Sequence, residues 1–166
     1  MRKRLGHTNE RISPATFKRE RVSALGRREP ATVHPASSLA DSIAAMQAGE
    51  TRSVLVTDAD GRLIGVFTER DVLLRVLGRE ADPTAPIARF MTENPHSVRL
   101  DSSLGDAIEV MERNGFNGLP VVDDDGLVAG HLDARDVLEY IAEAFPQEVL
   151  NLPPRPHQLL EQPEGA

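Results

Sequence analysis

Apolar residues with helical spacing form two stripes, and the second stripe lies 65 positions after the first. The first stripe is Leu39, Ile43 and Met46, and the second is Leu104, Ile108 and Met111. Residues three and four positions apart share one face of a helix, so each stripe predicts an amphipathic helix with one buried face. Ser38 and Ser103 precede the stripes, and an aspartate follows each serine three positions later. This spacing predicts a serine N-cap with an acid in the first helical turn.

Two hairpins are predicted on the C-terminal side of these helices. Their turns are Asp60–Gly61 and Asp125–Gly126, where glycine allows the positive φ of a tight turn. The flanking β-rich segments are Val54–Val56 and Leu63–Phe67 in one copy, and Leu119–Val122 and Leu127–Val128 in the other. Further elements are short strands at Thr32–Val33 and Ser97–Val98, and second helices at Asp71–Leu77 and Asp136–Ala144. Each half therefore has the order strand, helix, strand, strand, helix.

The two halves are a tandem duplication. Residues 22–75 pair with residues 87–140 without a gap, and 17 of the 54 positions are identical. A repeat that occurs only twice is too short an array for a solenoid. Because an isolated repeat of this length would be marginally stable, the halves are expected to share a core. We predict an α/β (α+β) fold in which two β-α-β-β-α repeats form one compact module.

The domain boundaries follow from the repeat and from the prolines around it. Ser13–Pro14 breaks the weak pattern at the N-terminus, so that region is interpreted as an arm. The predicted units are a basic flexible arm (1–21), the first repeat (22–78), a linker (79–86), the second repeat (87–143) and a proline-rich tail (144–166).

Charge is distributed unevenly over these units. The net charge is −7, but residues 1–30 contain nine of the 19 basic residues and only three acids. Such an arm could contact nucleic acid, an anionic lipid surface or an acidic partner, but it lacks interleaved aromatic residues. Its composition favours a solvated, flexible arm. We find neither an 18-residue apolar run nor a signal peptide, so we expect a cytoplasmic protein without membrane insertion.

Several kinds of chemistry are absent from the sequence. The chain has no cysteine, which excludes disulfides, thiolate catalysis and cysteine zinc sites. The aspartates before Gly61 and Gly126 suggest a calcium loop, but counting from either glycine puts Val56 or Val121 at the first ligand position, and neither can bind calcium. No phosphate-binding loop, dinucleotide fingerprint, HExxH or nucleophile-elbow motif occurs. We therefore expect no catalytic residues, no metal site and no enzymatic activity.

The strongest candidate for chemistry is the pair Thr68 and Asp71, which lies between a predicted strand end and a helix start. A carboxylate there can accept two hydrogen bonds from a vicinal diol such as a ribose. A hydroxyl beside free helix amides can bind a phosphate. The alternative is simple capping, because threonine followed three positions later by an acid is close to a capping box.

Residues 22–143 resemble a pair of CBS domains, the module first recognised in cystathionine β-synthase. The resemblance is carried by Gly65–Asp71, which follows the family's Gly-x-x-Thr/Ser-x-x-Asp signature, and by the segments Phe90–Pro95 and Leu119–Asp123. It implies two lobes related by a pseudo-twofold axis. It also implies that AMP, ADP, ATP or S-adenosylmethionine binds in clefts between the lobes as a regulatory ligand. Members usually dimerise and regulate an attached or associated enzyme or transporter.

Carried over residue by residue, the resemblance implies two clefts. The first would contain Val66, Thr68, Asp71, Asn94, His96, Phe116, Asn117 and Gly118. There Asp71 would hold the ribose diol, Thr68 would face the phosphate and Val66 would pack on the adenine. The second would contain Ala31, Arg52, Ser53, His131, Asp133 and Asp136.

The second cleft departs from the family pattern, because Asp133 stands where threonine or serine is expected. A carboxylate there would repel a phosphate. We expect the Asp71 cleft to be the nucleotide site. The Asp136 cleft should be empty, hold a neutral or cationic adenosyl ligand, or take a nucleotide only with a divalent cation such as Mg²⁺. The alternative is that Asp133 caps the second helix and that Arg52 or Arg135 neutralises it.

Two classes of function fit these patterns. The first is a non-enzymatic sensor that reports an adenosyl ligand to a partner. The second is an interaction or scaffold module with degenerate clefts, targeted by its basic arm. In either case a homodimer is expected through apolar helix faces, because one sheet face per lobe cannot cover them all. The residues predicted to form that interface are Leu39, Met46, Val72, Leu73, Val76 and Leu77.

Overall fold

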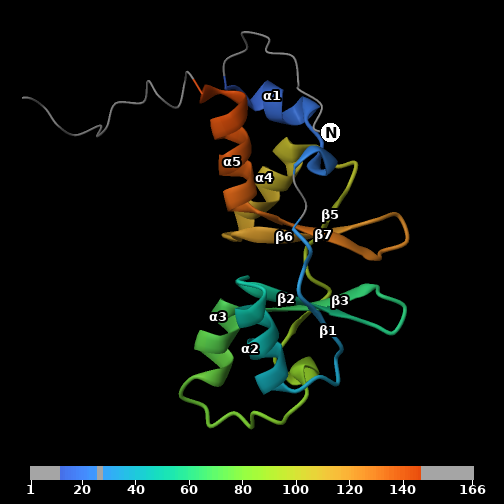
Figure 1. Ribbon diagram of the computed structural model, residues 1–166, viewed down its shortest axis with the longest axis vertical. Coiled ribbons are helices and arrows are strands. Elements are labelled where there is room, and N and C mark those ends of the chain that lie inside the picture. Colours follow the sequence, from blue (N-terminus) through green and yellow to red (C-terminus); the bar gives the residue numbers. More distant parts are fainter. Residues whose placement is uncertain (1–11, 26–27, 147–166) are drawn as a thin grey trace, which may run out of the picture.

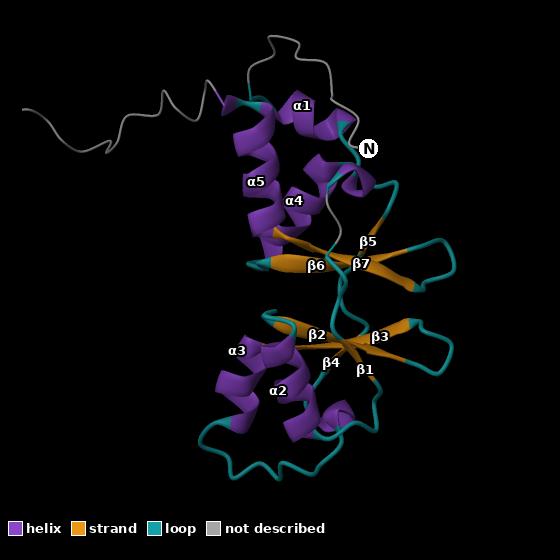
Figure 2. Ribbon diagram, viewed as in Figure 1, coloured by secondary structure: helices purple, strands orange, loops and turns teal. Residues whose placement is uncertain are grey.

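The computed structural model describes residues 12–25 and 28–146, which form two lobes stacked sheet to sheet (Figure 1). The sheets lie in the middle of the molecule, and the helices cover their outer sides (Figure 2). Residues 1–11, 26–27 and 147–166 lie outside the described part. They include the start of the predicted arm and all but the first residues of the predicted tail.

The first lobe contains a four-stranded sheet in the order β1-β2-β3-β4. Its strands are β1 (Thr32–Val33), β2 (Ser53–Thr57), β3 (Leu63–Thr68) and β4 (Thr92–Glu93). Its helical elements are α2 (Leu39–Ala48), α3 (Glu69–Asp71), the π-helical η2 (Val72–Val76) and the 3-10 turn η3 (Ile87–Arg89). Strand β1 runs parallel to β2, and the other neighbours are antiparallel.

The second lobe repeats this arrangement with a three-stranded sheet in the order β5-β6-β7. Its elements are β5 (Val98–Arg99), α4 (Leu104–Asn114), β6 (Gly118–Val122), β7 (Val128–Asp133) and α5 (Ala134–Ala144). The predicted order of strand, helix, strand, strand, helix is confirmed in both repeats. The predicted caps are confirmed as well, because Ser38 and Ser103 each accept a hydrogen bond of 3.0 Å from the amide three residues later.

Helix α1 (Pro14–Arg19) corrects the predicted flexible arm for the residues that the structure describes. Pro14 occupies the first helical turn, where its missing N–H costs nothing, so Ser13–Pro14 starts a helix instead of breaking one. Helix α1 packs on α4, and Phe17 packs against the core of the second lobe. A Cβ atom on Gly105 would lie 3.3 Å from Lys18 Cγ, so this glycine lets the two helices approach closely.

The first helical turn of each repeat is exchanged between the lobes. In the first repeat this turn is η1 (Val22–Ala24), and Val22 and Leu25 are buried in the core of the second lobe. In the second repeat the turn is η3, and Ile87 is 0% exposed in the core of the first lobe. Each lobe is therefore completed by residues of the other repeat.

Matching hydrogen bonds hold the exchanged turns in place. The amide of Val22 donates to the carbonyl of Ser102 at 3.0 Å, and the amide of Ile87 donates to the carbonyl of Ser37 at 2.8 Å. Both pairs are related by the 65-residue offset, so the exchange follows the pseudo-twofold relation between the repeats. The hairpin tips also join across the lobes, from Leu63 N–H to the Gly126 carbonyl and from Val128 N–H to the Gly61 carbonyl, both at 3.1 Å.

The distribution of apolar residues corrects the predicted dimer face. Leu39 and Met46 are buried in the core of the first lobe, so they are not part of an exposed surface. Val72 and Val76 pack partly against the same core. The exposed large apolar residues of the described chain include Leu73, Leu74, Leu77 and Leu138. Among the described residues, no helix is both long and apolar enough to cross a membrane.

The exchange predicts that Ile87 supports the lobe formed by the other repeat. Replacing Ile87 by alanine should lower the free energy of unfolding by about 2 to 5 kcal/mol, because it opens a cavity in a closed core. In double-mutant cycles the loss should be non-additive with Val54→Ala, in the first lobe, and additive with Val121→Ala, in the second. Urea unfolding measures all three effects, and coupling to Val121 alone would contradict the exchange.

Candidate functional site

The first motif forms a complete capping box at the end of β3. The Thr68 amide and hydroxyl both donate to Asp71 Oδ2, at 2.9 and 2.8 Å. The Asp71 amide donates in turn to Thr68 Oγ1 at 3.3 Å. The capping alternative for these two residues is therefore present in the structure. It uses one carboxylate oxygen of Asp71 and leaves the other for a further contact.

Arg75 lies beside that second oxygen. Its Nε is 3.4 Å from Asp71 Oδ1, and its Nη1 donates to the carbonyls of Phe90 and Met91 at 2.7 and 3.0 Å. Arg75 therefore connects the motif aspartate to the chain that follows the exchanged turn η3. Arg75 was not predicted as a site residue, although its position one helical turn after Asp71 is a usable signal.

The structure brings some of the other predicted first-cleft residues together. Val66 pairs with Thr92 of β4, and the Asn94 amide donates to the Ile64 carbonyl at 3.2 Å, so Asn94 lies next to β3. The rings of His96 and Phe116 lie 5.7 Å apart between centroids.

Asn117 and Gly118 lie at the start of β6 in the second lobe. The Asn117 carbonyl accepts the Ala134 amide at 2.8 Å, and Gly118 pairs with Asp133. No hydrogen bond or ion pair in the described chain joins either residue to Thr68 or Asp71. The structure therefore does not bring this part of the predicted first cleft into direct polar contact with its motif.

The second motif also caps its helix. Asp133 is the N-cap of α5, and its Oδ1 accepts the Arg135 amide at 2.8 Å. The Asp133 amide donates to Asp136 Oδ2 at 2.8 Å. The Arg135 guanidinium pairs with Glu139 at 3.4 Å, and Arg52 is exposed, with its carbonyl accepting the Glu69 amide at 3.0 Å. Capping by Asp133 is therefore seen, but neither arginine side chain forms an ion pair with it.

Arg28 is a charged residue beside the second motif, and it was not predicted from the sequence. Its Nε lies 3.1 Å from Asp136 Oδ1, and its Nη2 lies 3.9 Å from Glu139. The Asp136 side chain is only 7% exposed. Arg28 and Asp136 are 108 positions apart, so no local pattern predicts the pair.

A cavity of about 570 Å³ lies next to Arg28. It is lined by Arg28, Glu29, Pro30, Thr32, Thr57, Gly61, Val128 and Ala129. The carbonyl of Ala31, a predicted second-cleft residue in this segment, accepts the Leu55 amide of β2 at 2.9 Å. The segment that carries Arg28 is thus held between the two lobes.

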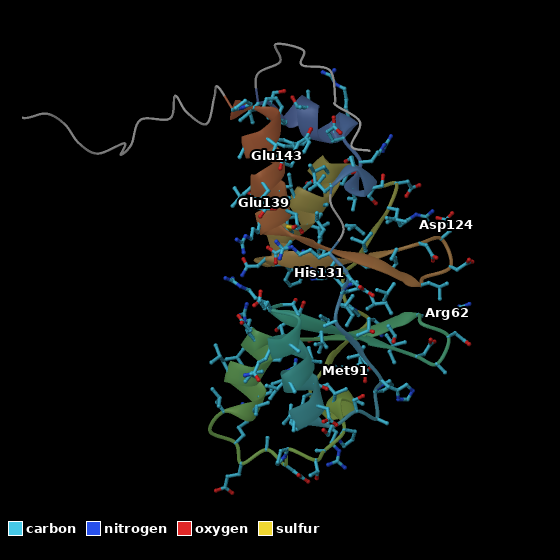
Figure 3. All side chains as sticks on the ribbon, in the orientation of Figure 1. Arg62, Met91, Asp124, His131, Glu139 and Glu143 are labelled. Carbon is cyan, nitrogen blue, oxygen red and sulfur yellow. The ribbon has the colours of Figure 1, made fainter. Side chains whose placement is uncertain are left out.

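His131 lies where the two sheets face each other (Figure 3). Ser53 Oγ lies 3.3 Å from His131 Nε2, which joins the lobes by a hydrogen bond. A Cβ atom on Gly118 would lie 2.5 Å from His131 Cε1, so only glycine leaves room for this ring. Burial lowers the pKa of His131 below 6.5, while the charges of Asp133 and Asp136 oppose that shift.

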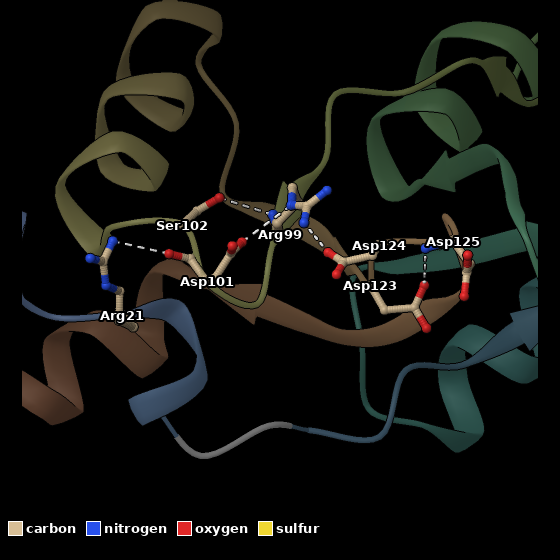
Figure 4. A network of polar contacts seen from close by, with 7 residues as sticks. All are labelled: Arg21, Arg99, Asp101, Ser102, Asp123, Asp124 and Asp125. Carbon is tan, nitrogen blue, oxygen red and sulfur yellow. Dashed lines mark hydrogen bonds and ion pairs between the residues drawn. The ribbon is translucent and has the colours of Figure 1, made fainter.

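In the acidic hairpin turn of the second lobe, Asp123 accepts hydrogen bonds from the turn's own backbone and Asp124 pairs with Arg99 (Figure 4). Asp123 Oδ1 accepts the amides of Asp125 and Leu127, both at 2.9 Å. Arg99 forms ion pairs with Asp101 and Asp124. In the part of the chain that the structure describes, no group of three histidine or acidic residues could hold a metal ion.

Comparison with known proteins links both repeats to one family. A sequence profile described as the CBS domain matches residues 22–78 and 87–143. A protein of Acidianus ambivalens, described as an uncharacterized 17.7 kDa protein in the bps2 3' region, is 29% identical over 117 residues. The matched part covers 70% of this chain and 70% of that protein.

Solved structures share the arrangement of the two lobes. The cytosolic domain of the Mg²⁺ channel MgtE in complex with ATP is 25% identical with a TM-score of 0.63, and the match covers 76% of this chain and 51% of that chain. A CBS domain protein from Pyrobaculum aerophilum complexed with AMP is 24% identical with a TM-score of 0.66, and the match covers 75% of this chain and 99% of that chain.

The lowered pKa of His131 predicts that stability depends on pH. Below about pH 6.5 His131 is protonated in the unfolded chain, whereas in the folded protein it stays neutral down to a lower pH. The free energy of unfolding therefore falls as the pH decreases toward the folded pKa of His131. The loss should be at most about 1.4 kcal/mol for each pH unit in this window. Urea unfolding at pH 7.5 and 5.5 should show it. His131→Val, which copies the residue at the twofold-related position 66, should abolish most of it, whereas the exposed control His96→Gln should not.

Proposed function

The chain belongs to the CBS domain family, and we propose that it is a non-enzymatic regulatory module that senses an adenine nucleotide. The site proposed for the ligand is the cleft at Val66, Thr68 and Asp71. The ribose diol would bind Asp71, the adenine would pack on Val66 and the phosphate would face the Thr68 hydroxyl. Asn94, His96, Phe116, Asn117 and Gly118 would border the same ligand.

The observation that carries this proposal is the state of the Asp71 carboxylate. Its side chain is 12% exposed, so it is largely desolvated. Oδ2 is used by Thr68, whereas Oδ1 accepts no hydrogen bond from the described residues and has Arg75 Nε at 3.4 Å. A carboxylate oxygen can accept two hydrogen bonds, so Oδ1 can receive a diol. In the second lobe the corresponding Asp136 Oδ1 already accepts a hydrogen bond from Arg28.

The solved relatives support an adenine nucleotide as the ligand class. The MgtE cytosolic domain carries ATP and the Pyrobaculum aerophilum protein carries AMP. We extend these ligands to the present chain as candidates, together with ADP and S-adenosylmethionine. A divalent cation such as Mg²⁺ would be needed only where a phosphate approaches the Asp133 carboxylate.

A partner protein completes the proposed function. A sensor without catalytic residues acts by changing its shape or contacts when the ligand binds. We propose an enzyme or a transporter in the cytoplasm as the regulated partner. The likeness to a channel's cytosolic domain supports this class of partner.

The capping boxes favour a second candidate function. Both motifs use their side chains to cap helices, which is what a scaffold with degenerate clefts would retain for stability. In that case the clefts would bind no nucleotide, and the basic N-terminal arm would direct the module to its target. Residues 1–11 of that arm lie outside the described part.

Asp71→Asn tests the proposed site directly. Asparagine keeps an oxygen for the Thr68 amide, so the cap is retained, but it removes the charged acceptor for the diol. AMP binding by titration calorimetry should weaken by roughly ten- to a hundredfold, or about 1.5 to 3 kcal/mol. The matched control is Asp136→Asn in the other motif, which should leave this affinity unchanged. If the unmodified protein binds no AMP, ADP, ATP or S-adenosylmethionine in a thermal-shift panel, the scaffold function is favoured.

We also propose a homodimer through the exposed leucines. Leu73 and Leu138 are related by the 65-residue offset and are 63% and 66% exposed. Leu73 lies in η2, directly after α3. Helices α3 and α5 lie below and above the pair of sheets, on the same lateral side of the molecule in Figure 1. A second copy of the chain could bury this pseudo-symmetric face in an isologous interface.

Acidic substitutions at the two related leucines test this interface. The double variant Leu73→Asp with Leu138→Asp should be monomeric in sedimentation at micromolar concentration, because dimerisation would bury the two introduced charges of each chain. The matched control, Leu73→Met with Leu138→Met, should remain dimeric. A monomeric unmodified protein would contradict the proposal.

A further inference from the structure

Arg28 contacts the carboxylate that a ribose would need in the second lobe. Its Nε donates to Asp136 Oδ1 at 3.1 Å, while Asp136 Oδ2 accepts the Asp133 amide at 2.8 Å. Both oxygens of Asp136 are therefore in use. A diol donates two hydrogen bonds, so it has to compete with the guanidinium for the remaining acceptor positions of Asp136.

Burial makes the aspartate depend on this arginine. The Asp136 side chain is 7% exposed and the Arg28 side chain is 52% exposed. An exposed ion pair is usually weak, but removing the partner of a desolvated carboxylate leaves a charge without compensation. Arg28 is also bridged to His131 of β7 through its backbone, so the guanidinium is held close to Asp136. Because it is tethered, the guanidinium competes with a ligand for Asp136 at a high effective concentration.

The first lobe has no arginine at the position related to Arg28. Glu93 stands at the position related to Arg28 by the repeat, and it carries the opposite charge. The cation near Asp71 is Arg75, which lies 3.4 Å from Oδ1 and uses its Nη1 on the carbonyls of Phe90 and Met91. The two clefts therefore differ in whether their aspartate is already hydrogen-bonded to an arginine.

We propose that Arg28 is a tethered competitor that closes the second cleft to ribose-bearing ligands and limits the chain to one bound nucleotide. This rests on the proposed function, because it uses the same contact between a carboxylate and a diol. Arg28 contributes more than Asp133 to keeping a ribose-bearing ligand out of the second cleft. The Asp133 carboxylate already accepts the Arg135 amide at the start of α5, where the helix dipole offsets its charge.

Titration calorimetry with AMP on the full chain, without divalent metal, counts the sites. The unmodified protein should bind one AMP per chain and Arg28→Ala should bind two. The added site should be at least roughly tenfold tighter than any second binding in the unmodified protein. Arg28→Met, which keeps an aliphatic side chain, should behave in the same way if the alanine variant is unstable. Adding Asp136→Asn to Arg28→Ala should remove the new site and so assign it to the second cleft.

Two controls separate Arg28 from general charge effects. Arg135→Ala removes the same charge from a side chain that pairs with Glu139, and it should leave one site. Asp133→Thr alone should also leave one site, because Arg28 still contacts Asp136. A second site opened by either control would overturn the proposal.

The outcomes also separate this proposal from the proposed function. One site in the unmodified protein and in both folded Arg28 variants overturns the role of Arg28 and leaves the Asp71 site standing. No binding by the unmodified protein, with one site in Arg28→Ala, overturns the Asp71 site and supports Arg28. Absence of AMP binding in every variant overturns both.

Discussion

The reciprocal exchange of the first helical turns is the contact on which the rest of the structure depends. Ile87 of the second repeat is buried in the first lobe, and Val22 of the first repeat is buried in the second. Neither repeat contains all of its own core, so neither lobe can close without the other. The exchange therefore fixes the two sheets face to face, and it explains why repeats of this length fold as one unit.

The same exchange connects each motif aspartate to a segment of the other repeat or to the chain that leads into it through an arginine. The chain that leaves η3 places β4 beside β3 and gives its carbonyls to Arg75, which lies near Asp71. The chain that leaves η1 places Arg28 beside β7 and directly on Asp136. In both lobes an arginine thus joins the motif aspartate to an exchanged segment, although it comes from the helix in one lobe and from the segment in the other. A ligand that displaces either arginine would alter the packing of a segment that both lobes share.

Local patterns in the sequence predicted most of the elements, and contacts between distant residues were beyond them. The serine caps, the Asp-Gly turns and the apolar stripes all act within a few residues, and the structure contains them as expected. The exchange could not be predicted, because duplicated segments such as Val22 and Ile87 suit either core. Within the candidate site the motifs themselves were found through the repeat. Arg28 was missed because it meets Asp136 across 108 positions. The dimer face was mispredicted because periodicity shows which face of a helix is apolar but not whether that face packs on the chain's own sheet or on a second copy.

Duplication copied a backbone, and substitutions at a few related positions made the two clefts unlike. His131 stands where the first repeat has Val66, and the larger ring is accommodated because Gly118 stands where the first repeat has Ser53. That serine in turn supplies the hydroxyl that the ring contacts across the lobes. The volume and polarity of these four residues therefore compensate one another, so the backbone hydrogen bonds of both lobes are preserved. Because the shared backbone tolerates such exchanges, Asp71 Oδ1 can have an arginine 3.4 Å away without a hydrogen bond, while Asp136 Oδ1 accepts one from Arg28.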